Sequence, residues 1–133
     1  FRALDEKWRY KAHELIQKEA RAIAEGMGAE VDIEIPPGYP SLKNDEHLSK
    51  LTRTIADDFL NSENVMTIPK RMGGEDFAFY TREIPACFYR VGVGNSMKGI
   101  SSHLHTPTFN VDEAAIEKSV GLMTYIGMEL LKE

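Results

Sequence analysis

Two histidines separated by a single residue, His103 and His105, are the side chains of this sequence best suited to chemistry. They lie in the run SSHLHTPTFNVDE, which covers residues 101–113. In an extended segment, side chains two positions apart project to the same side, so the pair could share a metal ion or a substrate. In a polar loop such a pair is more often solvated or hydrogen-bonded to its neighbours. The spacing alone leaves both interpretations open.

The run from Gly73 to Phe77 is a second candidate, because two glycines precede two acidic residues and an aromatic one. A loop of this kind could lead into a helix N-terminus, where backbone N–H groups would face an anion or a carbonyl oxygen. A mechanical interpretation fits equally well. Gly-Gly forms turns, and acidic residues in a first helical turn complement the helix dipole.

The other potentially reactive side chains have simpler explanations. Cys87 lies in an apolar run without a nearby charge that would favour a thiolate, so we expect a small core residue. His13 and His47 lie in helical patterns without a second ligand at helical spacing, and we expect both to be solvated. A single cysteine forms no internal disulfide, so a reducing, cytoplasmic location is the default expectation.

Bulk composition limits the class of protein. The 133 residues are 42% hydrophobic and 28% charged, which fits a globular chain with one modest core and one or two small domains. The net charge of -5 comes without a basic stripe, so nucleic acid and anionic membranes are poor candidate partners. No apolar segment at the start is typical of a signal peptide or a membrane span.

Hydrophobic periodicity predicts the elements of the first part of the chain. Apolar residues recur at three- and four-residue steps from Trp8 to Met27, which predicts an amphipathic helix that begins at Asp5 and stops at Gly26 and Gly28. The run EVDIEI at residues 30–35 alternates acidic with apolar residues and predicts a strand with one buried face. The prolines that follow indicate a linker.

The rest of the chain continues as helix, two strands and a last helix. We expect a helix over residues 44–61, capped by Asn44, and strands at residues 65–68 and 86–93. A C-terminal helix begins at Asp112. It contains two glycines that would allow close approach to a neighbour, Gly121 and Gly127.

Taken in order, the motifs of this chain resemble the metal-dependent aminoacylase and carboxypeptidase amidohydrolases, a family that includes hippurate hydrolase, N-acyl-L-amino acid amidohydrolase and the auxin-conjugate hydrolases. Phe1-Arg2-Ala3 is similar to the end of the family's Gly-Thr-x-Arg strand. The remaining matches are a Tyr-Pro-x-x-x-Asn return, a Gly-x-Glu-Asp-Phe loop and a Leu-His segment before an Asp-Glu helix start. They fall on Tyr39, Pro40 and Asn44, on Gly73, Glu75, Asp76 and Phe77, and on Leu104, His105, Phe109, Asp112 and Glu113.

The resemblance implies an α/β fold, the C-terminal part of a two-domain metallo-amidohydrolase. Residues 1–38 would be the end of an α+β lid or dimerisation domain. Residues 39–133 would be the last helix-strand-strand-helix segment of the α/β catalytic domain. The family's domain sizes then imply a C-terminal fragment of a chain roughly three times as long.

The resemblance also assigns roles to single residues. It implies that His105 is a metal ligand, that Arg2 holds the substrate carboxylate, and that His103 matches no ligand position. The complete enzyme would use a divalent metal, two zinc ions or manganese, cobalt or nickel, to activate water for the hydrolysis of N-acyl amino acids or peptides. The loop implied to line the substrate site consists of Gly73, Gly74, Glu75, Asp76 and Phe77.

One histidine does not hold two metals, since a zinc site needs at least three protein ligands. We therefore expect this chain to be catalytically inactive alone, to bind no metal by itself, and to require the missing N-terminal part of the same protein as a partner. Homo-oligomerisation is expected as well, because truncated domains leave strand edges and apolar faces uncovered. The alternative is a non-catalytic binding or assembly module derived from the same scaffold.

Overall fold

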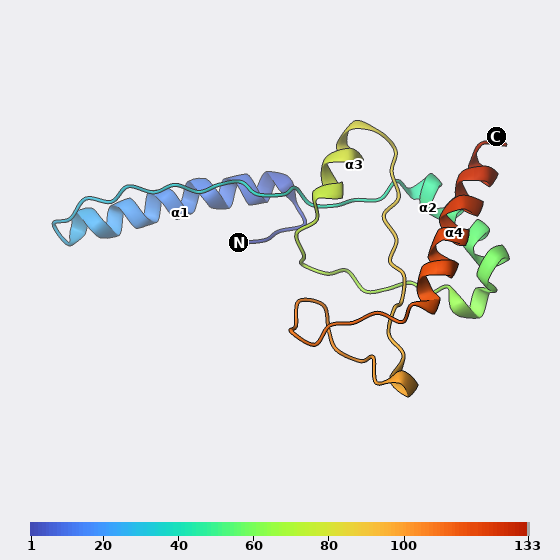
Figure 1. Cartoon of the computed structure of the whole chain (residues 1–133). Helices are drawn as coiled ribbons and strands as arrows, with labels where there is room; N and C mark the ends of the chain where they lie inside the picture. Colours follow the sequence, from blue (N-terminus) through green and yellow to red (C-terminus); the bar gives the residue numbers. More distant parts are fainter. Residues whose placement is uncertain (133) are drawn as a thin grey trace. The chain divides into compact units, whose positions relative to one another are not determined.

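The computed structural model describes residues 1–132 and divides the chain into two compact units. Unit 1 consists of Phe1–Asp45 and Ile68–Ala86, and unit 2 consists of Glu46–Thr67 and the chain from Cys87 onward. Helices are the dominant secondary structure of both units (Figure 1). The elements are α1 (Glu6–Gly26), α2 (Glu46–Leu60), the short 3-10 helix η1 (Ser62–Asn64), η2 (Asp76–Phe79), α3 (Tyr80–Glu83), η3 (Ser96–Lys98) and α4 (Ala114–Leu130).

The three long helices expected from hydrophobic periodicity are confirmed. Asp5 caps α1 as predicted, since its Oδ1 accepts a hydrogen bond from the backbone N of Trp8 at 2.8 Å. The helix ends at Gly26, and Gly28 adopts a left-handed φ of 71°. The helices α2 and α4 match the predicted helices over residues 44–61 and after Asp112.

The predicted strands are wrong: residues 30–35, 65–68 and 86–93 form no β-ladder. Pairing within residues 1–132 is limited to one antiparallel bridge between Asn95 and Ile100. Alternation of apolar residues indicates which side chains can face a core, but a sheet also needs a second strand to satisfy the backbone groups. The described chain is therefore mostly helical, and the α/β architecture of a two-domain protein stays a prediction.

The compact units do not divide the chain at residue 38, where sequence predicted a domain boundary. Residues 39–45 and 68–86 belong to the same unit as α1. The two units reflect contacts within this chain alone. The assignment of 1–38 and 39–133 to two domains of a complete enzyme stays a prediction.

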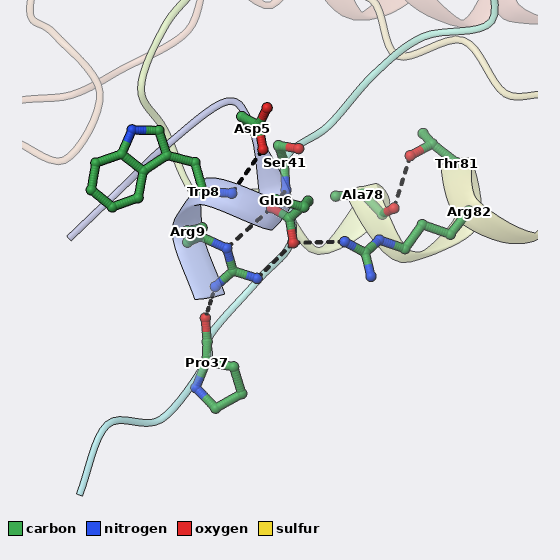
Figure 2. Close-up of polar contacts among 9 residues, drawn as sticks. All are labelled: Asp5, Glu6, Trp8, Arg9, Pro37, Ser41, Ala78, Thr81 and Arg82. Carbon is green, nitrogen blue, oxygen red and sulfur yellow. Dashed lines mark hydrogen bonds and ion pairs between the residues drawn. The ribbon is translucent and has the colours of Figure 1, made fainter. Parts of the chain in front are cut away.

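A single carboxylate, that of Glu6, connects three segments of unit 1 (Figure 2). Its Oε1 accepts hydrogen bonds from Arg9 Nε at 3.1 Å and from the backbone N of Ser41 at 2.8 Å. Its Oε2 accepts from Arg9 Nη2 at 2.8 Å and from Arg82 Nη2 at 2.7 Å. Arg9 also donates from Nη1 to the carbonyl oxygen of Pro37. We call these five residues the Glu6 cluster.

The burial of Arg9 increases the contribution of the Glu6 cluster to the free energy of unfolding. Arg9 is 4% exposed, although its side chain carries a full charge. The pKa of the Glu6 carboxyl falls from 4.5 to about 2, chiefly because of the hydrogen bonds from Arg9; the backbone N–H of Ser41 and the charge of Arg82 act in the same direction, and partial burial opposes them. Removing one member of a buried ion pair commonly costs about 3–5 kcal/mol, because the other charge stays buried without compensation.

Unit 2 is held by the contact between α2 and α4. Its buried core consists of Ala56, Leu122 and Ile126. A Cβ added at Gly121 would lie 2.9 Å from Cζ of Phe59, so the helices approach closely at this glycine, as the sequence predicted. Gly127 has no neighbour within 4 Å and plays no such role. Partly buried side chains that pack around the core are Ile55, Leu60, Val65, Tyr89 and Leu130.

Apolar side chains remain exposed in both units. On α4 the side chains of Ile116, Val120 and Met123 are all more than half exposed. None of the helices in residues 1–132 combines the length and the apolar character that crossing a membrane requires.

Acid should weaken unit 1 through Glu6. The Glu6 pKa is 4.5 when unfolded and about 2 when folded, so its contribution is complete above pH 4.5 and disappears as the pH falls through 2. At neutral pH that contribution amounts to at most roughly 3 kcal/mol. Urea unfolding followed by the fluorescence of Trp8, the sole tryptophan, should therefore show a free energy of unfolding that declines between pH 4.5 and 2.

The variant Glu6→Gln should start less stable at pH 7 and lose less of its free energy of unfolding over this pH range. Glu14→Gln is the matched control, because Glu14 pairs with Lys11 at 2.8 Å with both side chains more than 60% exposed. Water screens that pair, so its loss should change little. An unchanged pH dependence in Glu6→Gln would contradict the assignment.

Candidate functional site

Three residues from distant parts of the sequence, Arg2, Tyr39 and Gly74, meet in unit 1. A Cβ added at Gly74 would lie 2.8 Å from Arg2 Nη1 and 3.4 Å from Tyr39 Cδ2. The guanidinium and the ring thus occupy the space that a side chain at position 74 would need. Gly73 has nothing within 4 Å of the same hypothetical atom. Of the adjacent glycines, only Gly74 is needed for this contact.

The Arg2 side chain is exposed at this site. Its planar guanidinium presents parallel N–H donors that match both oxygens of a carboxylate. No ion pair joins Arg2 to an acidic residue within the described part of the chain, so these donors remain available to a ligand. Tyr39 adds an aromatic wall that stacks edge-on against Phe79, with ring centroids 6.1 Å apart. The arrangement can bind a carboxylate that has an apolar neighbour.

Sequence reasoning did not assign Tyr39 to the site. It belongs to the Tyr-Pro pattern, which was interpreted only as the return of the chain from one domain to the next. An aromatic residue placed just before a proline turn was the available signal, but nothing local indicated that it would lie against residue 74.

Glu75 has a capping role. Its Oε1 accepts a hydrogen bond from the backbone N of Phe77 at 3.3 Å, which caps η2. This favours the mechanical interpretation of Glu75, because its carboxylate occupies an N–H group that an anionic ligand would use. Asp76 is exposed in the first turn, and the ring of Phe77 lies 5.6 Å from that of Tyr80. Binding of substrate by Glu75, Asp76 and Phe77 stays a prediction.

His103 and His105 lie in unit 2 and are both exposed, and His105 is part of a turn. The extended backbone that would project both rings to the same side is absent: His105 has a left-handed φ of 63°, and Thr106 Oγ1 donates to the carbonyl oxygen of His103 at 2.8 Å. A non-glycine residue in this region costs roughly 1–3 kcal/mol, although histidine tolerates it better than most. The extended geometry that would favour a shared His-His site is thus absent.

Asp112 closes the base of the histidine loop, residues 101–110. Its Oδ1 accepts from Lys98 Nζ and its Oδ2 from Asn95 Nδ2, both at 2.6 Å. These bonds, that of Lys98 first, lower the pKa of Asp112 to about 2. Its backbone N donates to Val93 O at 2.8 Å, and its Oδ1 also accepts from Ala114 N at 3.3 Å at the start of α4. The predicted cap therefore also anchors the loop.

The residues present do not build a metal centre on their own. Among residues 1–132, no group of three or more histidine, cysteine, aspartate or glutamate side chains could hold a metal ion. His105 can supply one imidazole, and a zinc centre needs at least two further protein ligands. Its role as a ligand stays a prediction.

The side chains expected to be inert show mixed environments. His47 is exposed, as predicted. His13 is half-buried, with its ring edge-on to Phe1 at 6.2 Å and to Tyr10 at 6.0 Å, so it is packed rather than solvated. Cys87 is half-buried, and its sulfur accepts from Ser49 Oγ at 3.7 Å, so it lies at the edge of the core.

Comparison with known proteins identifies similar sequences. The profile described as peptidase family M20/M25/M40 matches residues 5–129. The chain is 32% identical over 104 residues to the protein named "Probable hydrolase sll0100" of Synechocystis sp., covering 77% of this chain and 26% of that protein. It is 35% identical over 78 residues to IAA-amino acid hydrolase ILR1-like 6 of Arabidopsis thaliana, covering 59% and 17%.

A third relative is N-acetyldiaminopimelate deacetylase of Exiguobacterium sibiricum, 29% identical over 119 residues, covering 86% of this chain and 29% of that protein. The chain thus spans less than a third of the length of these curated relatives. No solved structure matches it.

Placing a methyl group at residue 74 should displace Arg2 without unfolding the chain. The variant Gly74→Ala forces Arg2 Nη1 away, and a flexible arginine end can move at little cost. The free energy of unfolding should differ from that of Gly73→Ala by less than about 0.5 kcal/mol. The NMR signal of the Arg2 Nε–Hε group should shift in Gly74→Ala only; equal shifts in both variants would contradict the contact.

Loss of the Asp112 carboxylate should free the histidine loop. In Asp112→Ala, Lys98 and Asn95 lose their common acceptor, so backbone order parameters of residues 101–110 should fall toward values below about 0.6. Glu113→Ala is the matched control, because the Glu113 side chain caps nothing. A loop that keeps its order in Asp112→Ala, by NMR relaxation, would show that other contacts hold it.

Proposed function

This chain belongs to peptidase family M20/M25/M40, an amidohydrolase family, and on that premise we propose that it forms part of a metal-dependent enzyme that hydrolyses N-acyl amino acids or related amide and peptide bonds. The observation that carries the proposal is the contact of Arg2 and Tyr39 with Gly74. An N-acyl amino acid has a free carboxylate close to its scissile amide. Arg2 would hold that carboxylate through paired hydrogen bonds, and Tyr39 would border the adjoining apolar part of the substrate.

The names of two relatives support this substrate class. An IAA-amino acid hydrolase and an N-acetyldiaminopimelate deacetylase are both named for removing an acyl group from an amino acid. Substrates of this type share the carboxylate and the amide, and they differ in the acyl group. A site that binds the carboxylate would recognise a group that all these substrates share.

His105 is proposed as one ligand of the divalent metal, with two zinc ions, or manganese, cobalt or nickel, as candidates. Bound metal of this kind supplies an activated water for amide hydrolysis. Since the described residues contribute a single imidazole, the remaining ligands and the general base are assigned to other parts of the complete protein. This chain by itself is proposed to be inactive.

The exposed apolar side chains of Ile116, Val120 and Met123 favour additional polypeptide over α4. In the complete protein this would be the rest of the catalytic domain or a second copy. The same observation supports the alternative proposal, a non-catalytic assembly module. Metal-dependent turnover separates the two.

The test is His105→Ala in the complete protein. If His105 is a metal ligand, hydrolysis of N-benzoylglycine should fall at least 100-fold and the bound metal content should drop, both measured on purified protein. His103→Ala is the matched control two residues away and should keep near-normal activity. Full turnover in His105→Ala would exclude the ligand assignment. A wild-type protein inert with every N-acyl amino acid and divalent metal would favour the module.

A further inference from the structure

We propose that the Glu6 cluster is a positioning device for Arg2, with Arg82 as its decisive outer member, so that Glu6 and Arg82 tune the affinity for a substrate carboxylate that neither of them touches. This inference deepens the proposed function and rests on it for its kinetic consequence. Its structural part stands on the contacts of unit 1 alone.

The first argument is connectivity. The cluster joins the three segments that carry Arg2, Tyr39 and Gly74. Glu6 lies four residues after Arg2 at the start of α1, and Pro37 and Ser41 lie two residues on either side of Tyr39. Each of the first two site residues is therefore close in sequence to a member of the cluster.

Gly74 is tied to the cluster through α3. The helix η2 begins two residues after Gly74 and continues directly into α3, which carries Arg82. The Arg82 side chain reaches Glu6 Oε2 at 2.7 Å (Figure 2). That ion pair connects the η2–α3 segment to α1, so its loss should let the segment that follows Gly74 shift relative to Arg2.

The second argument is competition for charge. Glu6 is an acidic side chain close to Arg2 in sequence, but both its oxygens already accept two donors each. Asp5, also nearby in sequence, accepts from the backbone N of Trp8. With both oxygens of Glu6 occupied by donors, Glu6 does not compete for Arg2, and the Arg2 guanidinium stays available to an external carboxylate. Removal of Arg82 takes one donor from Glu6 and makes it a competitor for Arg2.

The experiment uses Arg82→Ala, because the Arg82 side chain is 43% exposed and a pair this exposed adds little to stability, so the variant should fold. Arg82→Lys keeps a positive charge that can reach Glu6 and should restore most of the effect. Arg21→Ala is the control, an exposed arginine of α1 that lies outside the cluster.

Two readouts are needed. In this chain, NMR should show the Arg2 Nε–Hε signal and the Gly74 amide shifted in Arg82→Ala, nearly restored in Arg82→Lys, and unchanged in Arg21→Ala. In the complete protein, KM for N-benzoylglycine should rise roughly threefold to tenfold in Arg82→Ala while kcat changes less than twofold. A purely stabilising role of Arg82 would move neither NMR signal nor KM selectively.

A double-mutant comparison separates the possible failures. If Arg82 acts through Arg2, Arg82→Ala should raise KM no further in the Arg2→Ala background. Equal effects in both backgrounds would overturn the positioning role. If Arg2→Ala leaves KM unchanged, the proposed carboxylate site fails instead, and the NMR signals alone then decide the structural part. Unchanged Arg2 and Gly74 signals in Arg82→Ala would overturn it.

Discussion

The buried guanidinium of Arg9 is the constraint on which unit 1 depends. A charge that is 4% exposed has exchanged its water for protein acceptors, and among residues 1–132 only Glu6 forms an ion pair with it. Once Glu6 is fixed by Arg9, its remaining lone pairs determine where Ser41 and Arg82 can lie. The polar contacts of this unit thus form a hierarchy: one buried pair, and two further segments that attach to it.

In unit 2, helix packing rather than a buried ion pair fixes the segments relative to one another. Its helices meet at Gly121, where a side chain would collide with Phe59, and their core is apolar. Tyr125 Oη on α4 also donates a hydrogen bond to Asp58 Oδ2 on α2 at 2.6 Å. Next to the histidine loop, the Asp112 carboxylate accepts hydrogen bonds from Lys98 and Asn95. In both units, a carboxylate at a helix start organises a loop that carries a candidate functional side chain. Helix starts suit this task because the backbone N–H groups there already favour negative charge.

Local patterns predicted the local features of this chain. The boundaries of α1 followed from Asp5 and Gly26, and Gly121 was recognised as a point of close approach, because capping and helical spacing involve neighbours in sequence. The predicted strands failed because a ladder needs a distant partner. For the same reason the contact between Glu6 and Arg82, 76 residues apart, was invisible, whereas the Glu6–Arg9 pair at helical spacing could have been expected. The left-handed φ of His105 could not be predicted either, because the conformation of the whole loop determines it.

The interleaving of the two units has a consequence for how the chain acquires its structure during synthesis. Unit 1 is completed only by residues 68–86, and by then α2 of unit 2 has already left the ribosome. The contact between Glu6 and Arg82 can therefore form only after α2 has been synthesised. Closing so long a loop is entropically costly and slow compared with helix formation. The nascent chain should thus pass through a stage in which its helices are formed and its ion pairs are not, a period in which protection by a chaperone would matter most.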